Sequence, residues 1–212
     1  MATSDSARSV KIAADERTGW SSERPRRDGA PPRPADVSVR SQVLRPADRM
    51  RYSPGSLLLV VGTETAAAGQ FLDRVLEDRG LAFSMPKVRK LLKGRVPDDE
   101  IESKARTLLD AAVSKRVEAG ESVVVLVEGF DAAERERYVR IAHGHRRPRH
   151  LLLIETPKSP VGDDERAPLA ELRRSLDAGE LGSEGFHTAV RLSGNAISEL
   201  KRIVFRPLAR DD

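Results

Sequence analysis

A run of small residues follows a continuous apolar segment in a pattern that could hold a phosphate group. Residues 57–61 are all Leu or Val, and a helical pattern begins soon after them. A phosphate-binding loop has this order of strand, tight turn and helix, and its motif is G-x-x-x-x-G-K-[ST]. The residues that would form such a loop here are Gly62, Thr63, Glu64, Thr65, Ala66, Ala67, Ala68, Gly69 and Gln70.

The groups that would carry out the phosphate chemistry are missing from this segment. Counted from Gly62, the second Gly of the motif is Ala67, the Lys is Ala68 and the Mg²⁺-binding hydroxyl is Gly69. Loss of a charge-assisted contact between Lys and phosphate costs about 1.5–3 kcal/mol. Glu64 adds a negative charge, and two like charges 4 Å apart repel by about 4 kcal/mol at an effective dielectric of 20. We therefore expect a degenerate phosphate loop without a cofactor of its own.

Alternating strands and helices must position this loop. Continuous apolar runs predict buried parallel strands at 57–61, 123–127 and 151–154, and shorter strands are expected at 81–84, 189–192 and 203–205. Helical spacing predicts helices at 71–79, 88–92, 97–119, 131–142, 169–176 and 197–200. This alternation is typical of an α/β fold, a parallel sheet flanked by helices.

The helix at 97–119 is the longest expected element. Pro97 opens it, Gly120 ends it, and three acidic residues occupy its first turn, where the helix dipole favours them. The side chains predicted to face the core are Ile101, Ala105, Leu108, Ala112 and Val113.

The first 52 residues differ in composition from the rest of the chain. They contain 11 Lys and Arg against 7 Asp and Glu, a net charge of +4, whereas residues 53–212 contain 26 of each. Because this segment is rich in Arg, Ser, Asp and Pro and has no sustained period, we expect a disordered basic tail over 1–52 and one α/β domain over 53–212. The tail could contact an acidic protein or a nucleic acid, although a solvated tail is the simpler interpretation.

Cysteine and long apolar segments are both absent from the sequence. Without Cys the chain can form neither disulfides nor thiolate metal sites. No apolar run reaches the ~18 residues that a membrane span requires, and the first residues lack the pattern of a secretory signal. We therefore expect a cytoplasmic protein without membrane contacts.

The order of these parts resembles the P-loop kinase family that includes polynucleotide-kinase-like and zeta-toxin-like enzymes. The resemblance extends over residues 55–206 and includes the segment Lys87-Val88-Arg89 after the second strand and Glu184-Gly185-Phe186-His187 before the last strands. It implies a three-layer, P-loop NTPase-like sheet. In an active member it would also imply ATP and Mg²⁺ as cofactors.

The resemblance can be carried over to individual functional positions. The Arg that the family places after its second strand corresponds to Arg89, but the Asp that precedes it corresponds to Pro86. The Asp that follows the third strand corresponds to Leu126, and Glu128 is the nearest carboxylate that could replace it. By position alone, the candidates for the arginines that close over the phosphates are Arg166, Arg173 and Arg174.

Three functions are compatible with this pattern. The first is a P-loop kinase-like domain that has lost phosphoryl transfer and serves as a binding or regulatory module. The second is an active ATP-dependent kinase of a nucleic-acid end, a nucleotide or a small metabolite, with a replacement cation from Lys87, Lys90 or Lys93, which otherwise form a solvated helix face. The third is a nucleic-acid-associated protein that works through its basic tail and the His- and Arg-rich loop at 143–150. An unrelated α/β fold, whose turn binds no phosphate, is the structural alternative.

A second group of possible ligands is the segment His143-Gly144-His145-Arg146-Arg147-Pro148-Arg149-His150. Its three His side chains lack the Cys or carboxylate that would complete a tetrahedral zinc site. Because the segment leads into the strand at 151–154, it lies at the amino edge of the sheet, whereas ligands of such sheets bind at the carboxyl edge. We expect a solvated turn here and no metal site, and we expect His187 to be a loop residue.

Overall fold

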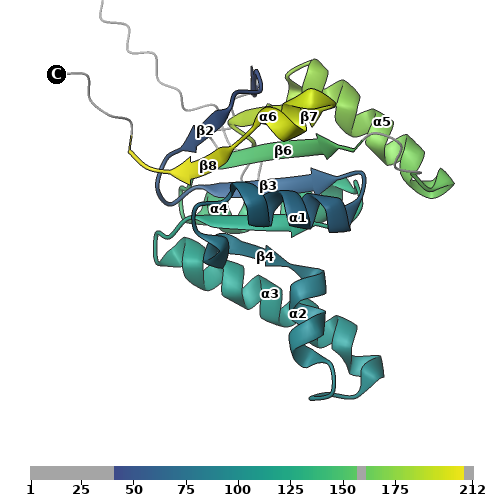
Figure 1. The fold of residues 1–212 in the computed structure, drawn as a ribbon. Helices are drawn as coiled ribbons and strands as arrows, with labels where there is room; N and C mark the ends of the chain where they lie inside the picture. The colour runs from purple at the N-terminus through teal and green to yellow at the C-terminus, as the bar shows by residue number, and fades with distance from the viewer. Residues whose placement is uncertain (1–40, 157–160, 208–212) are drawn as a thin grey trace, which may run out of the picture. The chain divides into compact units, whose positions relative to one another are not determined.

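The three apolar runs form the centre of a parallel sheet. The computed structural model describes residues 41–156 and 161–207, and in this part of the chain six strands pair in the order β1-β7-β6-β3-β5-β4. Every neighbouring pair is parallel (Figure 1). The strands are β1 (Gln42–Leu44), β3 (Leu57–Gly62), β4 (Ala82–Ser84), β5 (Val123–Val127), β6 (Arg149–Glu155) and β7 (Thr188–Ser193).

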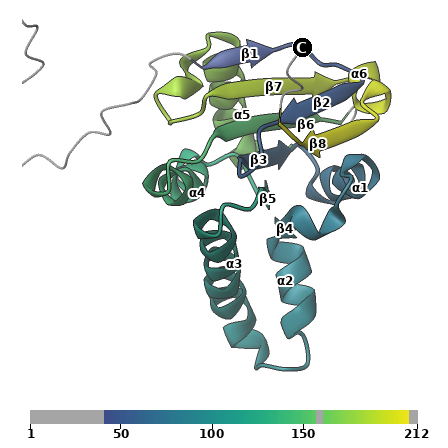
Figure 2. The same cartoon turned by 90° about the vertical axis from the view of Figure 1, so that its left-hand side faces the viewer.

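Helices cover both faces of this sheet and make three layers, as Figure 2 shows. On one face lie α1 (Thr65–Val75), α6 (Asn195–Glu199) and a two-stranded sheet of β2 (Arg49–Tyr52) and β8 (Arg202–Phe205). The opposite face packs against α3 (Ile101–Glu118), α4 (Ala132–Gly144) and α5 (Asp163–Asp177). The remaining helix, α2 (Met85–Leu92), follows β4 and lies beside α3. Short 3-10 turns occur at Arg79–Leu81, Asp98–Glu100 and Glu180–Gly182.

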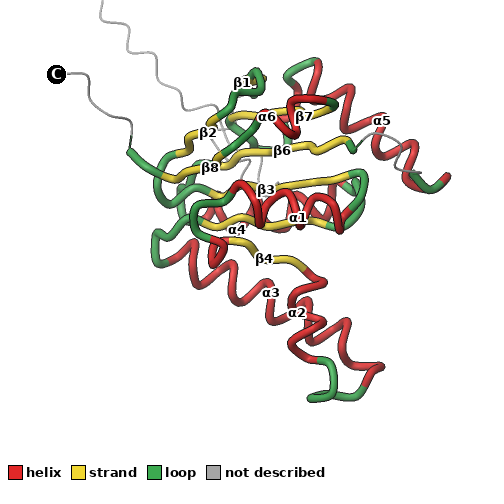
Figure 3. Tube along the Cα trace, in the orientation of Figure 1, coloured by secondary structure: helices red, strands yellow, loops and turns green. Residues whose placement is uncertain are grey.

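The predicted α/β class, with a parallel sheet between two layers of helices, is confirmed. Each of the central strands β3, β5 and β6 is buried along its whole length, which explains why their sequences are continuous apolar runs and do not alternate. The trace in Figure 3 follows the alternation of strand and helix from β3 to β7.

Residues 42–52, which we expected in the tail, belong to the fold. β1 pairs with β7 at the edge of the large sheet, and β2 pairs with β8. The sequence did not reveal them because these strands have only three and four residues, and β2 alternates exposed Arg with buried Met50 and Tyr52. The expected strand at 203–205 exists as β8, but it pairs with β2 and lies outside the large sheet. Residues 1–40 of the expected tail lie outside the described residues.

The buried face of α3 differs by one position from the predicted one. Leu109 is fully buried, whereas Leu108, predicted to face the core, is 50% exposed. The buried residues are Ala105, Leu109, Val113 and Val117, spaced four apart. Residues spaced four apart lie on one side of a helix, and here the series continues to Val117 in the last turn. These residues therefore define the side of α3 that faces the sheet.

The chain changes direction around β3, the strand between β5 and β6. The connection from β3 runs through α1 toward β4 at one edge, whereas the connections from β5 and β6 run toward the other edge. Loops at the carboxyl ends of β3, β5 and β6 therefore diverge to opposite faces. In open α/β sheets, ligands bind in the crevice at such a point.

The histidine-containing segment before β6 is less exposed than expected. Its first residues end α4, and its last two, Arg149 and His150, are buried in β6. The ring of His150 packs against that of Tyr52 with centroids 4.6 Å apart, and its Nδ1 lies 2.7 Å from the Thr188 hydroxyl. Its Nε2 has no hydrogen-bond partner among the described residues. His150 is therefore a core residue, and the expectation of a wholly solvated turn is wrong at this position.

We predict that His150 makes the fold sensitive to mild acid. Burial, reinforced by the nearby His187 and Arg149, lowers the pKa of His150 from 6.5 to about 4. Below pH 6.5 the unfolded chain binds a proton that the folded chain excludes, so the free energy of unfolding should fall as the pH drops from 6.5 toward 4. The shift corresponds to a loss approaching about 3 kcal/mol.

Urea unfolding of the wild type and of His150→Gln at pH 7 and pH 4.5 measures this contribution. The fall in unfolding free energy between the two pH values should be smaller in the variant, because Gln does not titrate. An equal fall in both proteins would show that other groups cause the acid sensitivity.

Candidate functional site

The turn between β3 and α1 is shorter than the phosphate loop that the sequence suggested. β3 ends at Gly62 and α1 begins at Thr65, so only Thr63 and Glu64 separate them. The Ala68 N–H already donates a helical hydrogen bond to the Glu64 carbonyl at 3.0 Å. Residues 65–70, expected in the loop, are therefore helical. The physical reason is the run of alanines at 66–68, because Ala has the highest helix propensity and extends α1 back toward the strand.

Close packing holds the start of α1 against the end of β3. A Cβ atom on Gly62 would lie 2.6 Å from the Ala68 Cβ and 3.3 Å from the Glu64 carbonyl oxygen. Ala68 is fully buried, and a Cβ on Gly69 would lie 3.7 Å from Leu126. Of the two positions that carry Lys and Ser or Thr in a working phosphate loop, position 68 thus faces the interior of the domain and position 69 is partly buried.

Thr63 fastens the turn to the end of β6. Its N–H donates to the Ile154 carbonyl at 3.0 Å, and its hydroxyl accepts a hydrogen bond from the Thr156 N–H at 3.0 Å. The Thr63 and Thr156 hydroxyl oxygens also lie 3.0 Å apart. These contacts join the carboxyl ends of β3 and β6 and fix the course of the turn.

The first turn of α1 keeps one feature that favours an anion. The N–H groups at the start of a helix have no partner within it and carry the positive end of the dipole. Glu64 occupies the N-cap position, makes no capping hydrogen bond and is exposed beside this turn. Its carboxylate would repel an incoming phosphate. The residues present therefore do not fit ATP–Mg²⁺, since the turn supplies no cation, the Thr63 hydroxyl is bonded to Thr156, and position 69 is a Gly without the Mg²⁺-binding hydroxyl of the motif.

Two of the predicted site residues, Arg89 and Glu128, do meet at the carboxyl end of β5. The Arg89 guanidinium donates two hydrogen bonds of 2.8 Å to the Glu128 carboxylate and bonds of 2.7 and 2.9 Å to Glu102. These bonds, first those to Glu102 and then those to Glu128, raise the pKa of Arg89 above its usual value. Both groups are therefore engaged with each other, and Glu128 is not available as a solitary base or metal ligand.

The three arginines that were candidates for closing over phosphates also pair with carboxylates. Arg173 is bonded to Glu155, the last residue of β6, while Arg174 pairs with Glu171 and Arg166 with Asp163 on α5 itself. Glu155 is buried, and it also accepts a bond from Arg191 of β7. Sequence reasoning missed Glu155, although an acidic residue at the end of an otherwise apolar strand is a signal that could have indicated it.

A further group of ion pairs links α3 and α4 near Glu128. Arg106 pairs with Glu134, and Arg137 lies 3.5 Å from Asp110. Burial raises the pKa of Asp110, and burial together with Asp110 and Glu134 raises the pKa of Tyr138 to about 12. The small cavity among these residues has a volume of about 60 Å³. Ligand pockets usually occupy about 300–1,000 Å³, so this cavity does not hold a nucleotide.

Two further properties limit the chemistry of the described residues. Within 41–156 and 161–207, no group of three or more His, Asp or Glu side chains is placed to hold a metal ion. None of the helices in these ranges has the length and apolar character needed to cross a bilayer.

Comparison with known proteins gives similarity at the level of structure alone. No family model and no curated protein matches the sequence. One similar solved structure is the tunicamycin resistance protein of Deinococcus radiodurans, with 18% identity over 66% of this chain and 87% of that chain and a TM-score of 0.36. A protein of Chloroflexus aurantiacus described as a kinase has 14% identity over 66% and 85% of the two chains and a TM-score of 0.39. A sugar kinase of a Janibacter species has 15% identity over 66% and 85% and a TM-score of 0.31. The fold assignment rests on the strand order and layers described above.

We predict that the contact between Gly62 and Ala68 controls stability. Gly62→Ala should lower the free energy of unfolding by about 1–3 kcal/mol, because the added methyl group overlaps the Ala68 side chain. In Gly62→Ala/Ala68→Gly the overlap is removed, and only a helix-propensity cost of about 1 kcal/mol should remain. Chemical unfolding of the wild type, both single variants and the double variant gives the coupling energy. Additive effects of the two substitutions would contradict this close contact.

Proposed function

We propose that this chain is a P-loop kinase-like α/β domain that does not carry out ordinary phosphoryl transfer and acts as a binding or regulatory module. The observation that carries the proposal is the course of the chain after β3. Only two residues separate Gly62 from α1; Ala68, at the motif position of Lys, is buried, and Gly69, at the position of the hydroxyl, is partly buried beside Leu126.

The energetics of phosphoryl transfer support the proposal. Such enzymes stabilise the charge of the transferred group almost wholly through positioned cations and Mg²⁺. Here the turn carries Glu64 and no cation. A nucleotide would lose a Lys contact of about 1.5–3 kcal/mol and meet repulsion from the Glu64 carboxylate.

The pairing of the candidate arginines is a second support. Arg89 is held by two carboxylates and Arg173 by the buried Glu155. All three guanidinium nitrogens of Arg89 donate to Glu102 and Glu128, so Arg89 would have to give up some of these bonds before it could hold a phosphate with two hydrogen bonds. Giving up these bonds costs free energy that a preorganised kinase site does not lose.

The competing function is an active ATP-dependent kinase in which another cation replaces the missing Lys. Lys87, the candidate on the first turn of α2, pairs with Asp73 of α1 at 3.2 Å. An active kinase should bind ATP tightly, whereas the binding module should not, so a nucleotide titration distinguishes the two functions.

Calorimetric titration with ATP–Mg²⁺ and an assay for phosphate transfer test the proposal. We expect binding weaker than about 1 mM, which corresponds to less than about 4 kcal/mol, and no turnover. The matched variant Glu64→Gln removes the repulsive charge without altering side-chain size. It should bind somewhat more tightly but should also show no turnover, because the Lys and the Mg²⁺-binding hydroxyl of the motif are still missing at positions 68 and 69. Micromolar binding by the wild type, with turnover that disappears when Gly62 is replaced, would establish the active kinase instead.

A further inference from the structure

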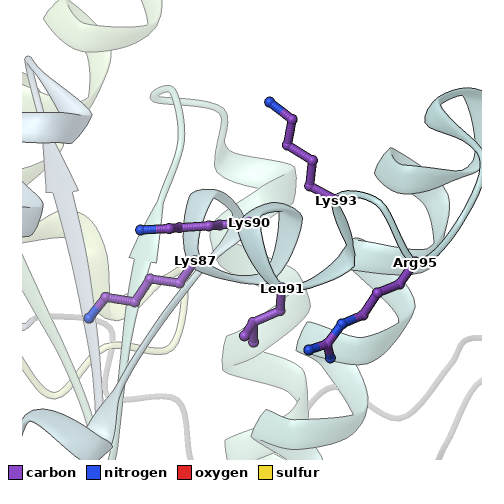
Figure 4. Close-up of a pocket in the computed structure, with 5 residues that line it drawn as sticks. All are labelled: Lys87, Lys90, Leu91, Lys93 and Arg95. Atoms are coloured by element: carbon purple, nitrogen blue, oxygen red, sulfur yellow. The ribbon is translucent and has the colours of Figure 1, made fainter.

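The exposed side of α2 and the connection that follows it carry a concentrated positive charge. Lys87, Lys90, Lys93 and Arg95 surround the exposed Leu91 and line a pocket of about 560 Å³ (Figure 4). All five side chains are exposed, and Leu91 retains 62% of its accessible surface. We call these five residues the α2 basic surface.

Most of this charge is not neutralised by the protein itself. Lys87 pairs with Asp73, but Lys90, Lys93 and Arg95 have no carboxylate partner within 4.0 Å among the residues that the structure describes. Arg89 on the same helix is bonded to both Glu102 and Glu128. α2 therefore has an inner side on which charge is balanced and an outer side on which it is not. Such an excess of one sign attracts a ligand of the opposite sign.

We propose that the α2 basic surface binds the phosphate backbone of double-stranded nucleic acid. From residue 87 to residue 93 the helix advances roughly 9 Å at 1.5 Å per residue. Each strand of duplex DNA carries one negative charge per about 3.4 Å of the helix axis, so about three phosphates of one strand lie along that length. The three lysines in that length therefore match the charge spacing of one strand, and Arg95 adds a fourth cation just beyond them.

The lining residues favour a duplex over a single strand. The pocket has no aromatic side chain on which an unpaired base could stack, and stacking is a main source of affinity for single strands. Contacts between Lys or Arg and phosphates carry no information on the base sequence, so the expected binding is independent of base sequence and sensitive to salt. DNA and RNA duplexes share this phosphate chemistry.

This surface is distinct from the turn between β3 and α1. The proposal does not depend on whether that turn binds a nucleotide, and a negative ATP titration leaves it unaffected. It gives the binding module a class of partner.

The test uses fluorescence anisotropy with the full-length chain, 20-bp DNA and RNA duplexes of two sequences each, and salt between about 50 and 200 mM. The test variant is Lys90→Gln/Lys93→Gln/Arg95→Gln. The matched control is Arg49→Gln/Arg51→Gln/Arg202→Gln, which removes three exposed charges from β2 and β8. Because both variants keep residues 1–40, any contribution of that basic segment is the same in each. Thermal unfolding confirms that all proteins are folded.

We expect the wild type to bind at least one duplex type equally for both sequences. The test variant should lose at least about ten-fold in affinity at 50 mM salt, and its salt slope should fall by about three, one for each cation. Those three contacts account for about a forty-fold loss of wild-type affinity between 50 and 200 mM salt. The control should change affinity by less than about three-fold, apart from a small long-range effect of net charge.

Three results would overturn the proposal. The test variant could bind as tightly as the wild type, or the control could lose as much affinity as the test variant, which would assign the effect to overall charge. A poly-glutamate peptide with the same net charge as the 20-bp duplexes could also bind the wild type more tightly than either duplex does. That result would assign the surface to an acidic protein partner.

Discussion

The close contact between Gly62 and Ala68 determines what the carboxyl edge of this sheet can do. A side chain on Gly62 would overlap Ala68, because the Ala68 Cβ lies only 2.6 Å from the position that a Cβ on Gly62 would take. The contact draws the first turn of α1 onto the end of β3, and Thr63 joins the same turn to β6. A loop that wraps around phosphates needs several residues between strand and helix, whereas here two residues make the connection.

The charged side chains around this edge form ion pairs with one another within the domain. Glu128 follows β5 and Glu155 ends β6, the two buried strands on either side of β3, and each holds arginines that could otherwise meet an anion: Arg89 at Glu128, and Arg173 and Arg191 at Glu155. These pairs join helices to strand ends and leave little unbalanced charge where a nucleotide would sit. Three cations without a carboxylate partner among the described residues, Lys90, Lys93 and Arg95, lie instead on the outer side of α2. We therefore place the proposed partner on the outer side of α2, away from the carboxyl edge of the sheet.

The central strands could be predicted well from the sequence. A strand that is buried on both faces, such as the one at 57–61, appears in the sequence as a continuous apolar run. The turn was predicted poorly, because alignment to a motif placed residues 65–70 in a loop while their helix propensity favours α1. β2 (Arg49–Tyr52) escaped detection, since four residues are too few to establish a period. The pairing of Glu155 with Arg191 joins residues 36 positions apart, and only the packing of β6 against β7 brings them together.

The most direct measurement of the closed turn is an NMR titration of the backbone amides of residues 62–70 with ATP–Mg²⁺, combined with hydrogen exchange of the Ala68 amide. If the turn is closed, the Ala68 N–H stays protected by its bond to the Glu64 carbonyl, and the amide signals do not saturate below about 1 mM nucleotide. Signals that shift and saturate at micromolar ATP, together with loss of Ala68 protection, would show that the first turn of α1 opens into a phosphate loop and would contradict this account.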